Sequence, residues 1–354
     1  MSALRADESL CVDELCITLI DCTLRVRTNA PALLADLAGY YSHVASDSVT
    51  PDIDIVAIER DAPELDLEFV DWKREPGKVG RKDAYVDLPG GRLVRKVRSG
   101  MVFLQSESRR VAAGPCRKYF SQLINFINSQ YMNWLQNRGW LICHAAGLVH
   151  RGKGLAIAGF SGAGKSTLML HLMQDDEVSF LTQDRLFAHA GSGAVLARGI
   201  PKLPRVNPGT IVHNTRLHSL LPAARRKALL QMPATELWNL EDKHDVPVDR
   251  LFGDGRIQQQ APLGALLILD WQHDSDRELE VERIELAARR DLLGVVMKSP
   301  GPFYQYPDGS FIEDTTPFDD ERYLDTLEGV AVYVARGRVD FPALAACCQQ
   351  KILA

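Results

Sequence analysis

The chain has 354 residues, which is enough for two domains because single hydrophobic cores stop growing near about 250 to 300 residues. Hydrophobic residues make up 46% of it and charged residues 25%, as in ordinary globular proteins. A formal net charge of −5 argues against a general nucleic-acid binder and against a membrane-surface binder, so we expect neither kind of partner.

The seven cysteines form an odd, irregularly spaced set. Cys11 and Cys16 have no matching Cys or His pair at the spacing of a zinc site. Residues 1–9 lack the apolar core of a secretory signal, and no uninterrupted apolar run reaches the length of about 18 residues that a membrane span requires. We therefore expect buried free thiols and a reducing, cytoplasmic location.

Residues 1–115 predict a small α+β domain. Alternating apolar residues indicate strands, and a proline at the start of a short apolar run indicates a helix. The predicted strands lie within 11–27, at 53–58 and in an antiparallel meander over 84–105, the helix spans 31–41, and the loop spans 61–82. No catalytic constellation stands out, so we expect a regulatory, scaffolding or substrate-selecting role.

Residues 116–140 predict one long amphipathic helix. From Arg117 to Arg138 the apolar side chains recur at three- and four-residue spacing, and Gly139 follows. The aromatic residues of this helix favour core packing or a domain junction over a ligand surface. We expect the domain boundary just before this junction helix and assign residues 141–354 to a second domain.

A glycine-rich turn in the second domain carries the strongest signal. It lies between an apolar strand pattern at 155–158 and a helix pattern at 167–173, and it matches G-x-x-x-x-G-K-[ST]. Glycines let the backbone approach a phosphate closely, and the amides of the turn and the helix N-terminus point at the anion. The predicted nucleotide-binding residues are Gly159, Ser161, Gly162, Ala163, Gly164, Lys165, Ser166 and Thr167.

The motif also predicts the cofactors, ATP and Mg²⁺. Lys165 is expected to reach the β- and γ-phosphates, and the Ser166 hydroxyl is expected to hold Mg²⁺. An acidic residue at the carboxyl end of a neighbouring strand would supply a second magnesium ligand or a catalytic base. Two aspartates compete for this position: Asp184, after the strand predicted at 178–182, and Asp270, after the strand predicted at 263–269. Helix capping is the alternative role for Asp184.

Two further segments have open roles. Residues 198–209 contain the cations Arg198, Lys202 and Arg205 among prolines and glycines, which predicts a loop suited to a second anionic group or simply exposed to solvent. Residues 214–256 are polar and charged, and predict either a closing lid or an exposed helical excursion. The remaining predicted elements are strands at 141–149, 279–286 and 330–334 and helices at 289–297 and 341–353.

Residues 144–209 resemble the P-loop kinases of the HPr kinase/phosphorylase group, which share a nucleotide-binding core with phosphoenolpyruvate carboxykinase. The motifs that carry the resemblance are Cys143-His144-Ala145, the phosphate loop, Thr182-Gln183-Asp184-Arg185 and Arg198-Gly199. Residues 199–210 and 236–243 are similar to the subfamily called HprK-related kinase B. The resemblance covers roughly residues 140 to 300. It implies an α/β P-loop core preceded by a small α+β N-terminal domain.

The resemblance also implies roles for individual residues. Asp184 would be the second acidic ligand of Mg²⁺ beside Ser166, and His144 would lie near the transferred phosphoryl group, although a lone strand histidine is often structural. The bifunctional enzymes have two adjacent aspartates, the first of which is thought to deprotonate the substrate serine. This chain has Gln183 at that position. The missing carboxylate weakens the case for phosphorolysis and for serine phosphorylation.

These observations predict a kinase, a Mg²⁺- and ATP-dependent phosphotransferase. It would transfer the γ-phosphoryl of ATP to a hydroxyl of a protein side chain or of a small metabolite. Lys165, Mg²⁺ and the cations of residues 198–205 would neutralise the γ-phosphoryl, and Asp184 or His144 would orient the acceptor.

The alternative is a protein that binds ATP without transferring its phosphoryl group. In this interpretation ATP orders residues 214–256 and controls a partner, as a sensor or assembly module. A slow ATPase is a third possibility. The family resemblance further implies a homo-oligomer and association with an ATP-grasp protein.

Overall fold

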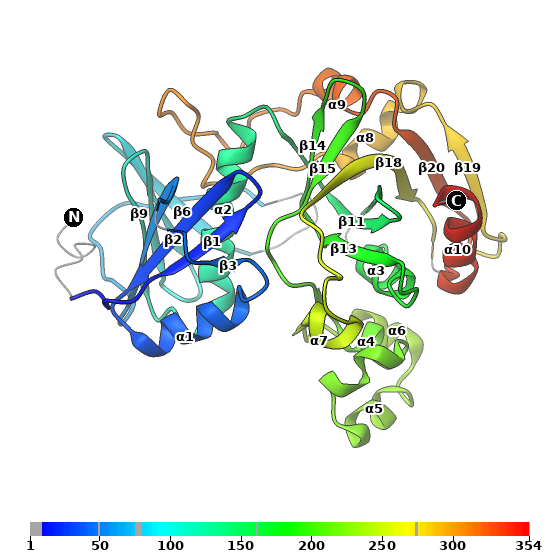
Figure 1. Cartoon of the computed structure of the whole chain (residues 1–354), viewed down its shortest axis with the longest axis horizontal. Coiled ribbons are helices and arrows are strands. Elements are labelled where there is room, and N and C mark those ends of the chain that lie inside the picture. The colour runs from blue at the N-terminus through cyan, green and yellow to red at the C-terminus, as the bar shows by residue number, and fades with distance from the viewer. Residues whose placement is uncertain (1–8, 49, 75–79, 161, 273–274, 354) are drawn as a thin grey trace. The chain divides into compact units, whose positions relative to one another are not determined.

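The computed structural model describes residues 9–48, 50–74, 80–160, 162–272 and 275–353, and it confirms a mixed α/β chain (Figure 1). Unit 1 comprises Met1–Gly139 with Ser299–Pro317, and unit 2 comprises Trp140–Lys298 with Phe318–Ala354. The assignment of all residues 141–354 to one domain is therefore corrected, because residues 299–317 return to unit 1. The amphipathic helix predicted within 116–140 also belongs to unit 1.

Unit 1 contains a sheet flanked by helices α1 (Pro31–Tyr40) and α2 (Phe120–Gln136). In sheet order the strands are β3 (Ala45–Ser46), β1 (Leu15–Leu19), β2 (Cys22–Thr28), β4 (Ile53–Glu59), β9 (Arg110–Gly114), β8 (Val102–Ser106), β7 (Gly91–Lys96), β6 (Asp83–Leu88) and β5 (Val70–Asp71). The prediction did not include β9. This alanine-containing strand has a weak strand pattern and forms because it pairs in parallel with β4 and antiparallel with β8.

Helix α2 buries its apolar face within unit 1, as its periodicity predicts. Its Phe126 ring lies 4.9 Å from the Phe103 ring and 5.3 Å from the Phe303 ring, measured between centroids. Phe303 belongs to the returning segment 299–317. The aromatic residues of α2 therefore serve core packing, and this packing explains why the returning segment belongs to unit 1.

Arg92 on β7 also holds the returning segment. Its guanidinium donates to both carboxylate oxygens of Asp87, at 2.6 and 2.9 Å, and to the carbonyl oxygen of Ile312 at 2.9 Å. The rings of Tyr85 and Phe311 lie 4.3 and 4.7 Å from its central carbon. Only 2% of Arg92 is exposed, so these contacts replace nearly all of its hydration.

Unit 2 also contains one large sheet. In sheet order its strands are β10 (Leu141–Cys143), β14 (Leu186–Ala190), β15 (Val195–Arg198), β18 (Gln260–Leu269), β12 (Lys153–Gly159), β11 (Ala145–His150) and β13 (Val178–Thr182), while β20 (Ala331–Arg336) pairs with β18 and with β19 (Glu280–Ile284). The central strands β12, β18 and β20 run parallel. Parallel strands covered on both faces need continuous apolar sequences, which is the pattern that β12 and β18 show.

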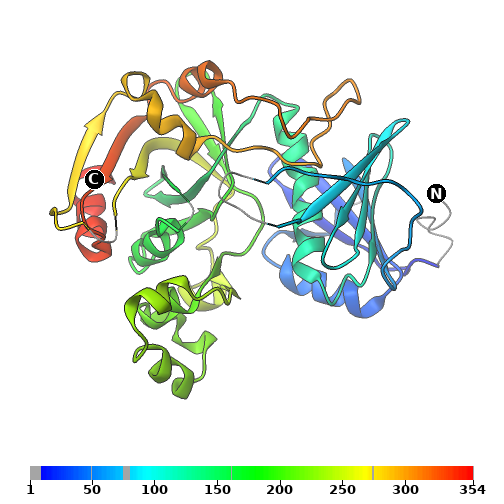
Figure 2. The ribbon, with the colours of Figure 1, turned by 180° about the vertical axis from the view of Figure 1, so that it is seen from behind.

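The two faces of this sheet bury different cores. Leu155 and Ile157 of β12 pack into the core that includes helices α3 (Lys165–Leu172) and α10 (Phe341–Cys347). Ala156 and Ala158 face the core that includes α8 (Leu293–Val296) and α9 (Asp320–Thr326). The alternation follows from the two-residue period of a strand. Figures 1 and 2 show α3 and α10 beside each other on their face.

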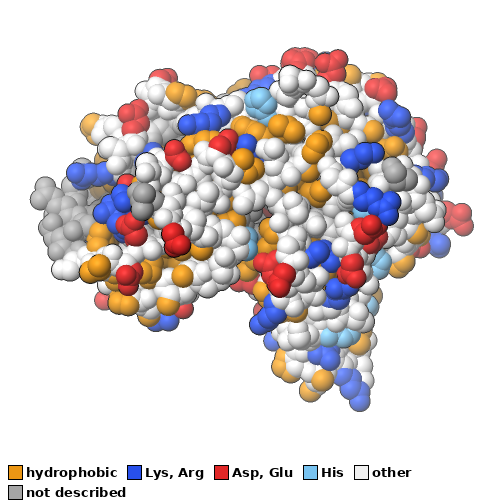
Figure 3. All heavy atoms as spheres, viewed as in Figure 1, with side chains coloured by type: hydrophobic (Ala, Val, Ile, Leu, Met, Phe, Trp, Pro, Cys, Tyr) orange, Lys and Arg blue, Asp and Glu red, His pale blue; other side chains and the backbone are white. Residues whose placement is uncertain are grey.

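Residues 208–252, here called the helical segment, leave the sheet and return to it (Figure 1). The segment contains α4 (Pro208–Val212), α5 (Ala223–Leu229), α6 (Ala234–Asn239) and α7 (Val248–Phe252). A helical excursion was one of the two predictions for this part of the chain, and its helices confirm it. Lys, Arg and His side chains gather on its projecting end (Figure 3).

The loop predicted at 198–209 is more ordered than expected. Strand β15 ends at Arg198, β16 (Arg205–Val206) pairs with β17 (His244–Asp245), and α4 begins at Pro208. All seven cysteines lie in the part of the chain that the structure describes, and all are free thiols. Among the described residues, no helix has the length and apolarity to cross a membrane.

Replacing Arg92 by Met should loosen the returning segment. The substitution leaves the buried carbonyl of Ile312 without its donor, so we expect the free energy of unfolding to fall by about 2 to 4 kcal/mol. Urea denaturation measures the loss, and limited proteolysis within 299–317 reports its location. The exposed Arg98→Met is the matched control, and equal losses in the two variants would contradict the role assigned to Arg92.

Candidate functional site

The glycine turn lies between β12, which ends at Gly159, and α3, which begins at Lys165. Gly162 and Gly164 have φ angles of +87° and +88°, a region that residues with a side chain rarely adopt. The predicted strand-turn-helix setting of the motif is therefore present. Ser161, one of the predicted nucleotide-binding residues, lies outside the described residues.

Lys165 is buried and turns back over the loop. Its Nζ donates to the carbonyl oxygens of Gly159 at 2.6 Å and Phe160 at 3.2 Å. A buried ammonium needs such acceptors because water is excluded from it. Phosphate oxygens, which form stronger charge-assisted hydrogen bonds, would compete with these carbonyls for the same nitrogen.

Gln183 connects Ser166 to the neighbouring strand β16. Its Oε1 accepts from the backbone N–H of Arg205 at 2.8 Å, and its Nε2 donates to the carbonyl of Arg205 at 2.6 Å. Because a backbone N–H only donates and a carbonyl only accepts, this pair fixes the orientation of the amide. The second hydrogen of Nε2 is directed to the Ser166 hydroxyl, 2.9 Å away. Gln183 therefore has a defined role as a bridge.

Asp184 is surrounded by positive or titratable nitrogen groups. His144 Nε2 lies 3.2 Å from Oδ1, and Lys298 Nζ and Arg185 Nε lie 3.6 and 4.0 Å from Oδ2. Enclosure would raise the pKa of Asp184, but the hydrogen bond from His144 and the charges of Lys298 and Arg185 outweigh it and hold the pKa well below its usual range. The carboxylate is thus ionised at neutral pH, and about half of the side chain remains exposed.

Backbone pairing brings His144 and Lys298 to this carboxylate. His144 lies between β10 and β11, and its N–H donates to the carbonyl of Val296 at 2.7 Å. Cys143 and Met297 form an isolated bridge beside it. The chain at 296–298 consequently runs along the end of β10 and places Lys298 next to Asp184.

A cleft of about 810 Å³ joins these groups within unit 2. This volume suits a ligand of nucleotide size, since small-molecule pockets span about 300 to 1,000 Å³. The predicted site residues that line it are His144, Gly162, Gly164, Lys165, Ser166, Thr167, Asp184, Lys202 and Arg205. Gln183 lines it too. Residues from separate predicted motifs therefore meet at one cavity.

Four of the described candidates are not in the lining of this cleft: Gly159, Ala163, Arg198 and Asp270. Arg198 is not among the described residues that line the cleft; its guanidinium stacks 4.3 Å from the Trp140 ring centre and donates to the Gln260 side chain at 2.7 Å. Its assignment as a phosphate contact is corrected, because these partners hold it in a buried structural position. Asp270, also outside the cleft lining, pairs with Arg336 at 3.4 Å. Of the two aspartates that compete for the role of second magnesium ligand or catalytic base, only Asp184 therefore lies at the cleft.

The sequence interpretation did not include the aromatic residues near the loop. Phe341, at the start of α10, packs against the loop so closely that a Cβ on Gly164 would lie 2.5 Å from its ring. Trp271 donates from its indole nitrogen to the carbonyl of Ala163 at 2.9 Å. Trp238 of α6 lines the cleft together with Phe341. Phe341 lies five residues after β20, but only the tertiary structure brings it to the glycine turn.

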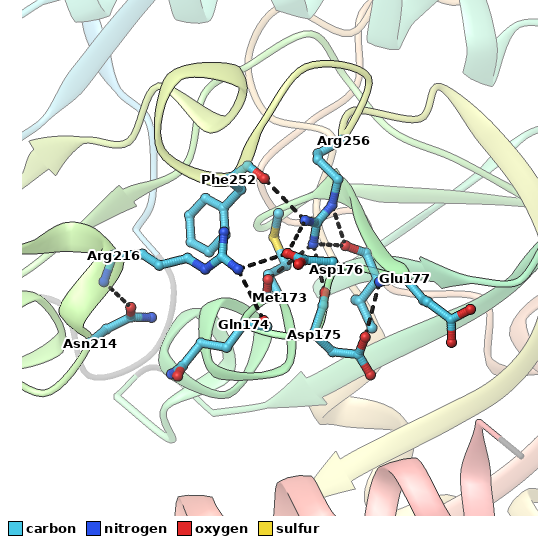
Figure 4. Close-up of polar contacts among 10 residues, drawn as sticks. Met173, Gln174, Asp175, Asp176, Glu177, Asn214, Arg216, Phe252 and Arg256 are labelled. Atoms are coloured by element: carbon cyan, nitrogen blue, oxygen red, sulfur yellow. Dashed lines mark hydrogen bonds and ion pairs between the residues drawn. The ribbon is translucent and has the colours of Figure 1, made fainter.

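Arg256 binds the backbone that follows the carboxyl end of α3 (Figure 4). It donates to the carbonyls of Met173 and Asp175 after α3, at 3.0 and 2.7 Å, and to the carbonyl of Phe252 at the end of α7, at 3.1 Å. Helix carboxyl ends leave carbonyls without partners, so one guanidinium satisfies two helices. Arg216, nearer the surface, donates to Asp176 at 2.7 Å.

Arg256 and Arg216 offer a matched pair of substitutions. Arg256→Met leaves several buried carbonyls unsatisfied, so we expect it to lower the free energy of unfolding by at least about 3 kcal/mol. Arg216→Met removes a partly exposed ion pair and should cost less than about 1 kcal/mol. Chemical denaturation of both variants tests the difference. A comparable loss in the two would show that the buried network is not the source of stability.

No family model matches the chain, and no curated protein matches it. Among solved structures, it is similar to the Hpr(Ser) kinase/phosphatase from Coxiella burnetii, with 12% sequence identity and a TM-score of 0.30 over 60% of this chain and 90% of that one. Identity and score are both too low to assign this chain to the family of that enzyme.

Proposed function

We propose that this protein is a Mg²⁺- and ATP-dependent phosphotransferase that acts on a hydroxyl of a protein side chain or of a small metabolite. The observation that carries the proposal is the meeting, in one cleft, of the glycine turn, Lys165, Ser166 and the ionised Asp184. These are the groups that phosphoryl transfer requires, because it depends mainly on positioning and on neutralisation of charge.

The loop fits a polyphosphate on structural grounds. Gly162 and Gly164 adopt left-handed backbone angles without a Cβ in the way, and the N-terminus of α3 follows directly. Backbone amides and the helix dipole at such a terminus favour an anion. Lys165, now bound to loop carbonyls, would hold the phosphates of ATP.

The cleft also offers the oxygen ligands that Mg²⁺ prefers. Ser166 supplies a hydroxyl and Asp184 a carboxylate, and Mg²⁺ commonly takes one or two protein ligands and completes its shell with water and phosphate oxygens. Among the described residues no group of three or more His, Cys, Asp or Glu gathers as a metal site. Bound by Ser166 and Asp184, Mg²⁺ would neutralise charge on the phosphates.

His144 and Asp184 would orient the acceptor. A carboxylate whose pKa lies well below its usual range is a weak proton acceptor, so Asp184 suits a metal ligand better than a general base. His144, 3.2 Å from that carboxylate, is the better candidate to receive a proton. The charges of Lys202 and Arg205, on the same cleft, would face the transferred group.

A specific contact also favours the second candidate, a nucleotide sensor. Gln183 links Ser166 to β16, and the Thr167 hydroxyl lies 2.8 Å from the hydroxyl of Thr210 on α4. The Thr167 contact connects the glycine turn directly to the helical segment, and the Gln183 contact reaches β16, which lies just before that segment. A nucleotide at the loop would change both, and the helical segment, a homo-oligomer contact or an ATP-grasp partner would then respond to it.

Lys165→Ala should abolish nucleotide binding. MgATP at a hundredfold excess over its dissociation constant stabilises the native state by about 2.7 kcal/mol, and the thermal shift that reports this should disappear in the variant. Lys153→Ala, an exposed lysine at the opposite end of β12, is the control and should keep the shift. The absence of a shift in the wild type would refute the proposal.

Transfer of labelled γ-phosphate from ATP to a protein or metabolite fraction of a cell lysate separates the two candidates. A kinase labels an acceptor, and Asp184→Asn should reduce this labelling at least about a hundredfold if the carboxylate acts in the transition state. A sensor binds MgATP and labels nothing. Labelling that persists unchanged in Asp184→Asn would remove Asp184 from the mechanism.

MgATP affinity should also decline at alkaline pH. Burial and the positive charge of Arg185 lower the pKa of Lys202 to about 8, Arg205 adds to the effect, and Asp184 and Asp245 oppose it. Because the charged lysine binds phosphate better, the association constant for MgATP should fall as the pH rises above about 8. Lys202→Arg remains charged, and its association constant should stay level to about pH 10. If calorimetry gave the wild type and Lys202→Arg identical pH profiles of MgATP affinity, the result would contradict a role for Lys202 in phosphate binding.

A further inference from the structure

An aromatic pair lies in the part of the cleft beyond the glycine turn. The rings of Trp238 on α6 and Phe341 on α10 have centroids 6.5 Å apart and planes only 25° from parallel. Both side chains are partly exposed, and both line the same cleft as Gly162 and Gly164. Both aromatic residues therefore belong to the cavity that holds the glycine turn.

Phe341 is held in place relative to the loop. Its ring stands edge-on to Trp271, with centroids 5.1 Å apart and an angle of 88°. Trp271 in turn donates to the carbonyl of Ala163, and the Phe341 ring fills the space where a Cβ of Gly164 would be. One side of the pair is thus fixed to the backbone that would bind phosphate.

The strand topology places Phe341 at the edge of the sheet to which the glycine turn also belongs. Strands β12, β18 and β20 are parallel, so their carboxyl ends meet at one edge of the sheet. The glycine turn follows β12, Trp271 follows β18, and Phe341 follows β20. Ligands of open α/β sheets bind at this edge.

We propose that Trp238 and Phe341 form the nucleobase subsite, on which the purine of the nucleotide stacks while its phosphates reach the glycine turn. This inference rests on the proposed nucleotide binding and adds the residues that recognise the base. Carbon atoms in contact lie about 3.5 to 4 Å apart, so a flat ring between two others needs about 7 to 8 Å. The two rings already lie nearly parallel, with centroids 6.5 Å apart, and a displacement of α6 would open the space that a base between them needs.

The subsite has two consequences. Stacking uses the face of the base and tolerates different edges, so ATP and GTP should bind with similar affinity. A base held between α6 and α10 also connects the helical segment to the phosphate loop through the ligand. The nucleotide, and not the phosphates alone, would then fix the position of α6.

The decisive experiment compares MgATP with magnesium tripolyphosphate, which has the phosphates but no base. Binding of each to the full chain is measured by calorimetry in the wild type, Trp238→Ala, Trp238→Phe and Leu230→Ala. Trp238→Ala should weaken MgATP about 5- to 150-fold and leave tripolyphosphate within about twofold, because only base stacking is lost. Trp238→Phe should retain most of the MgATP affinity. Leu230→Ala, an exposed apolar side chain of the same helical segment, should change neither ligand.

Other outcomes overturn the inference in distinguishable ways. If Trp238→Ala binds MgATP as tightly as the wild type, or loses both ligands equally, Trp238 does not recognise a base. If the wild type binds neither ligand, the proposed nucleotide site fails and the subsite with it. Should Trp238→Ala not fold, tryptophan fluorescence of the wild type decides: ATP must quench it more than tripolyphosphate does, and Trp238→Phe must lose the difference.

Discussion

The backbone at Gly164 satisfies two structural constraints of unit 2: a left-handed turn before α3 and close packing against Phe341. Its φ of +88° starts α3 from a left-handed turn, and the ring of Phe341 occupies the position that any side chain would take. A residue with a Cβ would strain the turn and displace α10 from it. The conformation of the glycine turn and the position of the Phe341 ring in the cleft therefore both depend on a glycine at position 164.

The charges of the cleft follow from the same arrangement. Lys165 is buried and takes the loop carbonyls as partners, while Asp184 is held ionised by His144, Lys298 and Arg185. An enclosed carboxylate surrounded by cations keeps its charge, since their attraction outweighs the cost of desolvation. The cleft therefore combines a buried ammonium group with an ionised carboxylate.

The helical segment is attached to this site at several points of different strength. Arg256 fixes its end to the carboxyl end of α3 through buried hydrogen bonds, whereas Thr167 contacts Thr210 of α4 beside the loop through a partly buried one. Gln183 contacts β16, just before the segment. Buried networks are costly to open, and partly exposed contacts exchange readily with ligand or water. The contact beside the cleft is therefore easier to exchange than the hydrogen bonds at the base of the segment. The bridge from Ser166 to β16 explains how Gln183, a residue without a charge to contribute, takes part in the site.

Local sequence determined the parts of this protein whose physics is local. Neighbouring residues specify the glycine turn, the apolar sequences of β12 and β18 and the periodicity of α2. These elements, and the position of Lys165 and Ser166 at the start of α3, were therefore predictable. Weak strands such as β9 were not, because alanine-rich segments become strands only when two partners flank them. The return of residues 299–317 to unit 1 depends on Arg92 and Phe303, whose partners are distant in sequence.

Tertiary structure alone decided which predicted residues share the cleft. Parallel pairing of β12, β18 and β20 brings Trp271 and Phe341 to the glycine turn, and the bridge beside Cys143 brings Lys298 to Asp184. Arg198 and Asp270 have the same charge chemistry as the residues that line the cleft, yet their strands direct them to Trp140 and Arg336. A side chain's type is set by sequence, whereas its partners are set by strand order and register, which depend on contacts between residues far apart in the chain.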